Sequence, residues 1–242
     1  MKNKFAVTLA AAAFASFAST SALADPTVVT LGNGFGSLAG EFNAHVTGGT
    51  FTSYQSSSVL NGTGASFVTF CLEKNEYFSG YTQPLYVKAV NTGAVNGGVD
   101  GPSQGNFDPI SVQTAYLYTQ FSKGTLSSYD YGGTSAVRAA DADALQNAFW
   151  YLEGELGTQS SALFNTLSAQ TKTWITEANT SGWTGIGNVR VLNLYTSPSF
   201  GTSISQDQLF MLPVPEPETY AMMLAGLGLI GFVANRRRRK LV

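Results

Sequence analysis

Short apolar runs separated by glycine and asparagine fill much of the chain from residue 25 to about residue 90. Residues 27–31, 49–54 and 67–72 are examples, rich in Val, Thr, Phe and Tyr. Such runs, bounded by turn-forming residues, are typical of β-strands joined by tight turns. Because alternate residues of a strand share a face, Phe67, Thr69 and Cys71 are expected on one face, with Cys71 near the end of the strand.

A loop dense in glycine and asparagine, residues 91–106, precedes a helical section. Asp108 is a suitable N-cap residue, and Pro109 fits the first helical position. Gly124 is a helix-ending signal. The pattern therefore predicts a first helix from residue 108 to residue 124.

A second helix is predicted over residues 141–156, where apolar residues recur every three to four positions. Gln146 and Trp150 lie one turn apart, on the shoulder of this apolar stripe. Asp141 and Asp143 suit the start of the helix because acidic side chains favour its dipole there. The stripe consists of Leu145, Ala148, Phe149, Leu152 and Leu156.

A third helix is predicted over residues 161–179, with Leu163, Leu167 and Trp174 facing inward. Strands at residues 189–195 and 208–212 close the domain. The expected fold class is α+β: a β-rich barrel or sandwich that carries a helical section.

The two ends of the chain differ from this middle. Residues 1–24 combine a basic start, a short apolar core and small residues before the expected cleavage site, which is typical of a secretory signal peptide. Residues 25–212 form the extracytoplasmic domain. Residues 213–242 contain Pro215, Glu216 and Pro217, then a short apolar stretch expected to form a transmembrane helix. A basic cluster of Arg236, Arg237, Arg238 and Arg239 follows, and the positive-inside rule keeps it cytoplasmic.

This tripartite tail resembles the PEP-CTERM sorting signal. The resemblance implies an exosortase as partner, in the inner membrane of a Gram-negative bacterium, and an association with surface or exopolysaccharide material. It implies that the protein is anchored in the inner membrane by its C-terminal helix and reaches the cell surface or extracellular matrix after processing.

Composition excludes several other classes of function. The formal net charge is −2, and five of the 13 basic residues lie at positions 236–240. The folded part is therefore acidic and offers no basic groove for nucleic acid. One cysteine and one histidine allow neither an intrachain disulfide nor a zinc site of the usual His/Cys type. We expect no metal and no cofactor.

Cys71 and Gln146 form the most informative pair of residues. Cys71 follows an aromatic residue at a strand end, and about 75 residues later Gln146 begins a Gln-x-Ala-Phe-Trp segment. The two motifs resemble the thioester domains of bacterial surface adhesins. The resemblance implies that Cys71 and Gln146 condense into an internal thioester, with Ala148, Phe149 and Trp150 packing the helix that presents Gln146.

A thioester carbonyl is an electrophile that an amine or hydroxyl can attack once, which links the protein covalently to another surface and frees the thiol. A buried, aromatic-lined site would slow hydrolysis by excluding water. The expected function is therefore non-enzymatic covalent attachment to surface amines or hydroxyls. Exopolysaccharide is one expected source of these groups.

Three alternatives remain open. In the first, Cys71 is a structural core residue in a non-covalent, exopolysaccharide-associated matrix protein. In the second, Cys71 and His45 form the dyad of a hydrolase. In the third, Asp141 and Asp143 with Glu153 or Glu155 bind calcium, although the sequence contains no calcium loop with alternating ligands.

Overall fold

The computed structural model describes residues 27–32, 35, 40–47, 66–77, 83–95, 107–132, 136–212 and 222–230. The predicted signal peptide, the predicted strand at 49–54 and most of the predicted sorting tail lie outside these residues. The first and last predicted strands of the domain lie inside them, so the described part covers most of the folded middle.

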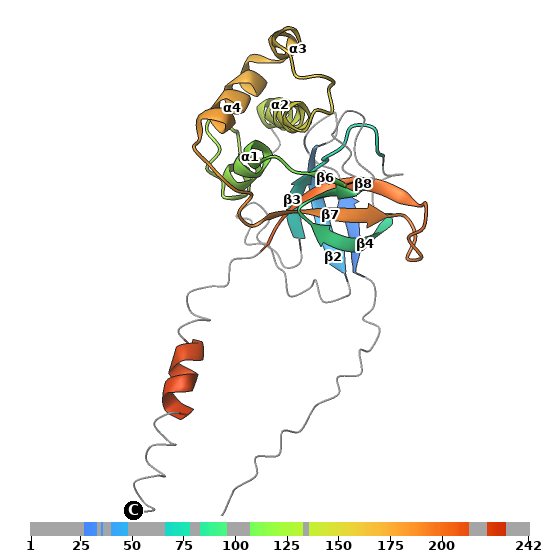
Figure 1. The fold of residues 1–242 in the computed structure, drawn as a ribbon, viewed down its shortest axis with the longest axis vertical. Helices are drawn as coiled ribbons and strands as arrows, with labels where there is room; N and C mark the ends of the chain where they lie inside the picture. The colour runs from blue at the N-terminus through green and yellow to red at the C-terminus, as the bar shows by residue number, and fades with distance from the viewer. Residues whose placement is uncertain are drawn as a thin grey trace, which may run out of the picture.

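Six antiparallel strands form the main sheet, in the order β3-β2-β1-β4-β7-β8 (Figure 1). Two short strands, β5 and β6, pair separately. β5 lies within the loop predicted at residues 91–106, and β6 directly follows that loop. The strands are β1 (Val28–Gly32), β2 (Gly40–Thr47), β3 (Ser66–Phe70), β4 (Pro84–Asn91), β5 (Gly93–Val95), β6 (Phe107–Pro109), β7 (Val189–Tyr195) and β8 (Ile204–Met211).

The edges of the main sheet approach each other without closing it. β3 and β8 are the two edge strands, and they meet at an isolated antiparallel bridge between Cys71 and Gln208. The Leu72 N–H also donates to the Asp207 C=O at 3.0 Å. The expected α+β class is confirmed. Of the expected barrel or sandwich, the strands that the structure describes form no closed barrel, because β3 ends before a full ladder with β8 can form.

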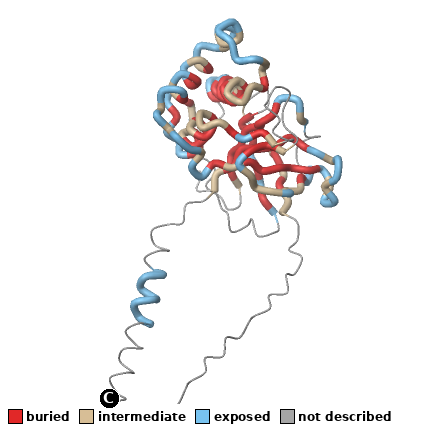
Figure 2. The backbone as a smooth tube through the Cα atoms, in the orientation of Figure 1, coloured by how far each residue is buried: buried red, intermediate tan, exposed pale blue. Residues whose placement is uncertain are grey.

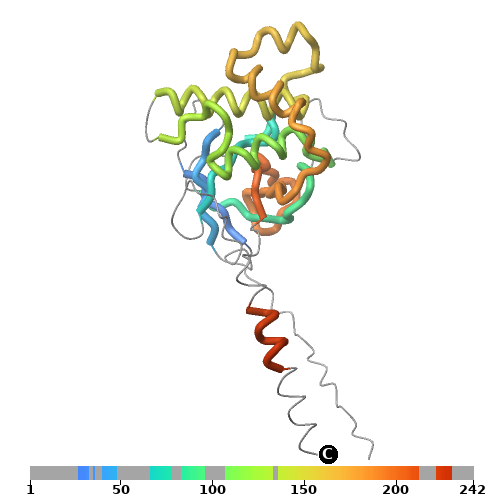
Figure 3. The backbone as a smooth tube through the Cα atoms, turned by 90° about the vertical axis from the view of Figure 1, so that its left-hand side faces the viewer, coloured from blue at the N-terminus to red at the C-terminus, as the bar shows by residue number. Residues whose placement is uncertain are grey.

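Four helices lie together at one end of the sheet, as Figures 1 and 3 show from two directions. Helix α2 contacts β2, whereas α1 contacts β7 and β8. The helices are α1 (Val112–Ser122), α2 (Ala136–Leu152), α3 (Ser161–Thr166) and α4 (Ala169–Thr180).

The first helix begins later than predicted. Asp108 and Pro109 belong to β6, and the N-cap of α1 is Ser111, whose side chain accepts a hydrogen bond from the Thr114 N–H. The predicted end at Gly124 is confirmed: this glycine follows the C-cap with φ +71°, a conformation that favours glycine at the end of a helix.

The second and third predicted helices also have different bounds. Helix α2 begins at Ala136, so Asp141 and Asp143 lie within it and do not start it. The predicted third helix is broken into α3 and α4 because Ser168 adopts an extended conformation and caps α4, accepting from the Thr171 N–H. Trp174 is fully buried as predicted, while Leu163 and Leu167 are only half-buried.

Two hydrophobic clusters stabilise the domain. The larger lies between the helices and the sheet and includes Phe70, Tyr118, Phe149 and Trp174. The smaller is built from side chains of the sheet strands and includes Cys71. Figure 2 shows the buried backbone concentrated where the helices meet the sheet. The end of β3 therefore touches both clusters.

Candidate functional site around Cys71 and Gln146

Cys71 directly follows β3, at the point where the two sheet edges meet. Its side chain is fully buried, and the Gln208 Nε2 donates to its Sγ at 3.2 Å. Burial raises the pKa of the Cys71 thiol well above its usual range, although the hydrogen bond from Gln208 opposes the shift. The thiol is therefore protonated at neutral pH and shielded from solvent.

Gln146 reaches this strand end from the middle of α2. Its Oε1 accepts from the Cys71 N–H at 3.1 Å, and its Nε2 donates to the Cys71 C=O at 2.7 Å. Strand β2 begins at Gly40, opposite Phe70, so the Gln146 amide occupies the place beside Cys71 that a further residue of β2 would fill. Two residues 75 positions apart are thus held together by paired hydrogen bonds.

Gly40 makes room for this arrangement. A Cβ atom at Gly40 would lie 2.8 Å from the Gln146 Oε1 and 2.3 Å from the Phe70 ring, closer than real Cβ contacts allow. Only glycine therefore fits between the amide of Gln146 and the aromatic side chain before Cys71. The sequence pattern alone contains no signal for this requirement.

Aromatic side chains surround the helix face that carries Gln146. The rings of Phe70 and Phe149 meet edge to face at 5.2 Å, and both are fully buried. Ala148 is also fully buried, and Trp150 is 6 % exposed. Within the described part of the chain, the Trp150 Nε1 has no hydrogen-bond partner. The surroundings of Gln146 are therefore apolar and closed to bulk water.

A buried ion pair fixes α2 against β2 near this site. Two guanidinium nitrogens of Arg138, in the first turn of α2, bind both carboxylate oxygens of Glu41, the residue after Gly40. The Tyr129 hydroxyl donates to the same carboxylate at 2.6 Å. These contacts hold the helix that carries Gln146 in register with the strand that carries Gly40.

The residues of the alternative interpretations lie elsewhere. His45 is exposed on β2, and its Nδ1 is 3.0 Å from the Ser66 Oγ, whereas the thiol of Cys71 faces Gln208. The Asp141 carboxylate accepts from the Asp130 N–H at 2.8 Å. The structure thus does not pair Cys71 with His45, the pairing that a hydrolase dyad requires.

Glu153 and Glu155, which the calcium alternative names as ligands, instead accept hydrogen bonds from backbone N–H groups. Glu153 accepts from both the N–H and the hydroxyl of Ser111, at the start of α1. Glu155 accepts from the Lys74 N–H at 3.0 Å. Burial raises the pKa of Glu153 to about 7, although the hydrogen bonds from Ser111 lower it.

Three other acidic residues, none of them predicted from the sequence as a site residue, gather beside Cys71. Glu73 and Glu76 follow β3, and Asp207 precedes Gln208 on β8. Burial and the neighbouring carboxylates raise the pKa of Glu73 to about 12 and that of Asp207 to about 8. The sequence feature that could have indicated this cluster is the polar run Gln206-Asp207-Gln208 within a strand.

A separate pocket of about 570 Å³ opens beside the C-terminal end of α2. Two aromatic rings, Tyr151 and Phe164, meet there at 5.8 Å. The amide side chains of Gln113, Gln159, Asn165 and Asn179 share the lining. The pocket therefore combines aromatic faces with amide donors and acceptors.

The described part of the tail is a helix over residues 222–230, whose large apolar side chains are exposed. Among the described residues, no helix has both the length and the apolar character needed to cross a membrane. The predicted transmembrane helix extends beyond the described residues on both sides.

Comparison with known proteins identifies the tail. Residues 213–239 match the PEP-CTERM protein-sorting motif, which includes the predicted Pro215, Glu216 and Pro217 and the predicted arginine cluster. No curated protein and no solved structure matches the chain. The resemblance of the middle domain to adhesin thioester domains thus has no support from these comparisons. The motif marks the chain as an exported protein that is anchored in a membrane and then processed by an exosortase.

Proposed function

We propose that this exosortase-sorted protein attaches covalently to surface material through a thioester between Cys71 and Gln146. The observation that carries the proposal is the paired hydrogen bonding of the Gln146 amide to the backbone of Cys71 in a fully buried site. The thiol belongs to the same residue as these backbone groups. Its Sγ accepts a hydrogen bond from Gln208, so bond formation requires a side-chain rotation that turns the thiol toward the Gln146 amide.

Formation of the bond balances without any co-reactant. The Cys71 Sγ attacks the Gln146 Cδ, the Sγ–Cδ bond forms, and the Cδ–Nε2 bond breaks. The thiol proton leaves with the amide nitrogen as ammonia. The raised pKa of the thiol means that this proton is present at neutral pH. A neutral thiol is a weak nucleophile, so the reaction depends on the proximity of the two groups.

The later attachment step consumes the thioester. An amine or hydroxyl of the target attacks the Cδ carbonyl carbon, an amide or ester forms, and the Cys71 thiol is released. The Cys71 N–H, which already binds the Gln146 Oε1 at 3.1 Å, is suitably placed to stabilise negative charge on that oxygen. The aromatic side chains around Gln146 would limit the competing attack by water.

Methylamine trapping of the full chain tests this function. The reagent should add at Gln146, located by peptide mapping, and should release one thiol per chain. Cys71→Ala should abolish the adduct, while Asn147→Ala, one position along α2, should retain it. Absence of an adduct at Gln146 in the folded wild-type protein would contradict the proposal.

A second candidate function is non-covalent binding of exopolysaccharide, favoured by the pocket beside α2. Aromatic rings and amides are the groups that commonly contact sugars, and Tyr151 and Phe164 supply the rings. Tyr151→Ala should weaken sedimentation of the protein with exopolysaccharide from the producing cells, and Cys71→Ala should not. Unchanged sedimentation of Tyr151→Ala would remove this candidate.

A further inference from the structure

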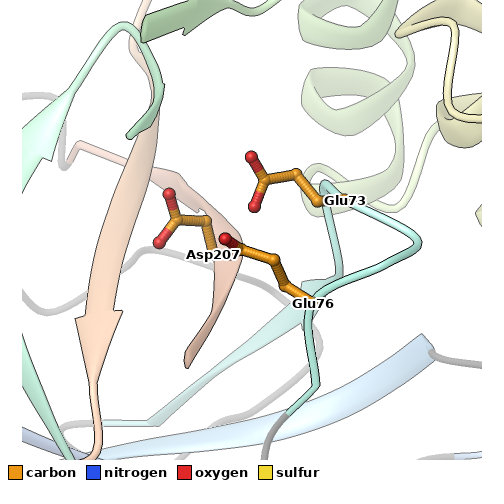
Figure 4. Close-up of side chains that lie close together, drawn as sticks. All are labelled: Glu73, Glu76 and Asp207. Carbon is orange, nitrogen blue, oxygen red and sulfur yellow. The ribbon is translucent and has the colours of Figure 1, made fainter. Parts of the chain in front are cut away.

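Three carboxylates converge at the seam between β3 and β8. Glu73 and Glu76 approach from the segment after Cys71, and Asp207 approaches from β8 (Figure 4). One oxygen of each carboxylate lies within 4.8 Å of the others. Ionised carboxylates at this separation repel one another strongly in a buried setting, so the cluster must either take up protons or bind a cation.

Glu73 has no compensating partner among the residues that the structure describes. The residue is 1 % exposed, and neither of its carboxylate oxygens has a hydrogen-bond partner in the described part of the chain. The Glu76 Oε2 is also buried and without such a partner there. Burying a carboxylate without hydrogen bonds is costly, and native proteins place such groups against cations or metal ions.

Hydrogen bonds hold the Asp207 carboxylate in a fixed position in the cluster. Its Oδ1 accepts from the Leu194 N–H at 2.9 Å, and its Oδ2 accepts from the Asn193 Nδ2 at 2.7 Å and the Val95 N–H at 3.0 Å. A carboxylate has about four acceptor positions, so these bonds leave capacity for a further ligand. They also hold the carboxylate in position without a conformational change.

We propose that Glu73, Glu76 and Asp207 bind one calcium ion. All three donors are carboxylate oxygens, which hard divalent cations prefer. Two ligands of one Ca²⁺ can be at most about 4.6–5.2 Å apart, twice the metal–oxygen distance, and the three donor atoms lie within 4.8 Å of one another, so the set is compatible with one ion. Opposite ligands of Mg²⁺ are only about 4.0–4.2 Å apart, and that ion demands stricter geometry. The rest of the coordination shell is left to water.

The ion would join the segment after Cys71 to β8. The sheet edges otherwise meet there through one bridge and the hydrogen bond from Leu72 to Asp207. Calcium binding would therefore stabilise the open seam of the sheet. This role does not depend on thioester formation, and it differs from the expectation that the protein has no metal site.

Calcium titration of the full chain tests the site. The protein is purified in detergent, stripped with a chelator and dialysed, and its thermal unfolding midpoint is followed as CaCl₂ is added. We expect the midpoint to rise with calcium at a half-effect in the range of about 10⁻⁴–10⁻³ M or below, as in other extracellular sites. Isothermal titration should give one ion per chain.

Conservative variants locate the effect. Glu73→Gln should lose the calcium-dependent shift, and Glu76→Gln, in a partly exposed segment where the fold is less at risk, should weaken binding at least about tenfold. Glu177→Gln removes a partly buried carboxylate of α4 outside the cluster and should bind as the wild type does. No shift in the wild type at ~10 mM calcium would overturn the proposal. So would unchanged binding in Glu76→Gln, and an equal response to Mg²⁺ would overturn the assignment to calcium.

Discussion

Arg138 and Glu41 form a buried ion pair that joins α2 to β2, and both side chains are at least nine-tenths buried. Removing one partner leaves the other charge uncompensated. Arg138→Ala should therefore lower the free energy of unfolding by about 3–5 kcal/mol, measured by urea denaturation. Lys123→Ala, which removes an exposed cation, should change it by less than about 0.5 kcal/mol.

The double variant Arg138→Met with Glu41→Gln separates charge from packing. It removes both charges but keeps an acceptor for the Tyr129 hydroxyl. Most of the lost stability should return, because replacing both members of a buried pair is often neutral. A double variant as unstable as Arg138→Ala would show that the ion pair is not the cause.

Phe149 tests the packing of the helix that carries Gln146. Its ring is fully buried and contacts Phe70 and Tyr118. Phe149→Ala should cost about 3–5 kcal/mol in thermal or chemical unfolding. Asn147 donates from its Nδ2 to the Asp143 C=O within the helix, and Asn147→Ala should change the free energy of unfolding little. Equally small effects would contradict the packing described for α2.

Gly40 links the fold to the proposed chemistry. Gly40→Ala places a methyl group 2.8 Å from the Gln146 Oε1, so we expect a loss of about 1–3 kcal/mol and a strong loss of the methylamine adduct. Gly32→Ala is the matched control, since its Cβ would lie 3.6 Å from the nearest atom, the Asn43 carbonyl oxygen. An adduct of wild-type yield in Gly40→Ala would mean that Gln146 reacts from another position.

Glu153 predicts how stability changes with pH. Its pKa rises from 4.5 to about 7 on folding, so between these values the folded chain binds more protons than the unfolded chain. The stabilisation from this group is complete below about pH 4.5 and is lost as the pH rises through about 7. The expected loss is on the order of 2 kcal/mol, after allowance for partial exposure.

Glu153→Gln provides the comparison for this pH dependence. Asp108 is a titratable neighbour whose charge also raises the pKa of Glu153. The difference in unfolding free energy between variant and wild type should change in favour of the variant as the pH rises from 4.5 to 7. A difference that is constant over this range would contradict the raised pKa of Glu153.

Much of the fold followed from local patterns. The last strand but one occupies residues 189–195 as predicted, because its apolar and β-branched residues leave no alternative. The break between α3 and α4 was missed, since the capping of α4 by Ser168 competes with a continuous apolar repeat. Strand β5 was missed because it has only three residues and its partner strand β6 lies across a glycine-rich segment.

The candidate site was predictable only in part. The spacing of Cys71 and Gln146 in the sequence singled out both residues, but the paired hydrogen bonds between them depend on tertiary packing. Gln208 and Asp207 approach Cys71 from a strand more than a hundred residues away, and no local pattern encodes that contact. The polar run around Asp207 does mark β8 as unusual, since buried strands are mostly apolar.

The mass of the intact protein tests the central claim most directly. Burial alone would make the Cys71 thiol unreactive, so thiol reagents do not discriminate. The full chain, purified gently at neutral pH and with its processed ends mapped, should be lighter than its sequence mass by one ammonia, and Gln146→Ala should show no such loss. A folded wild-type chain of full sequence mass would contradict the thioester between Cys71 and Gln146.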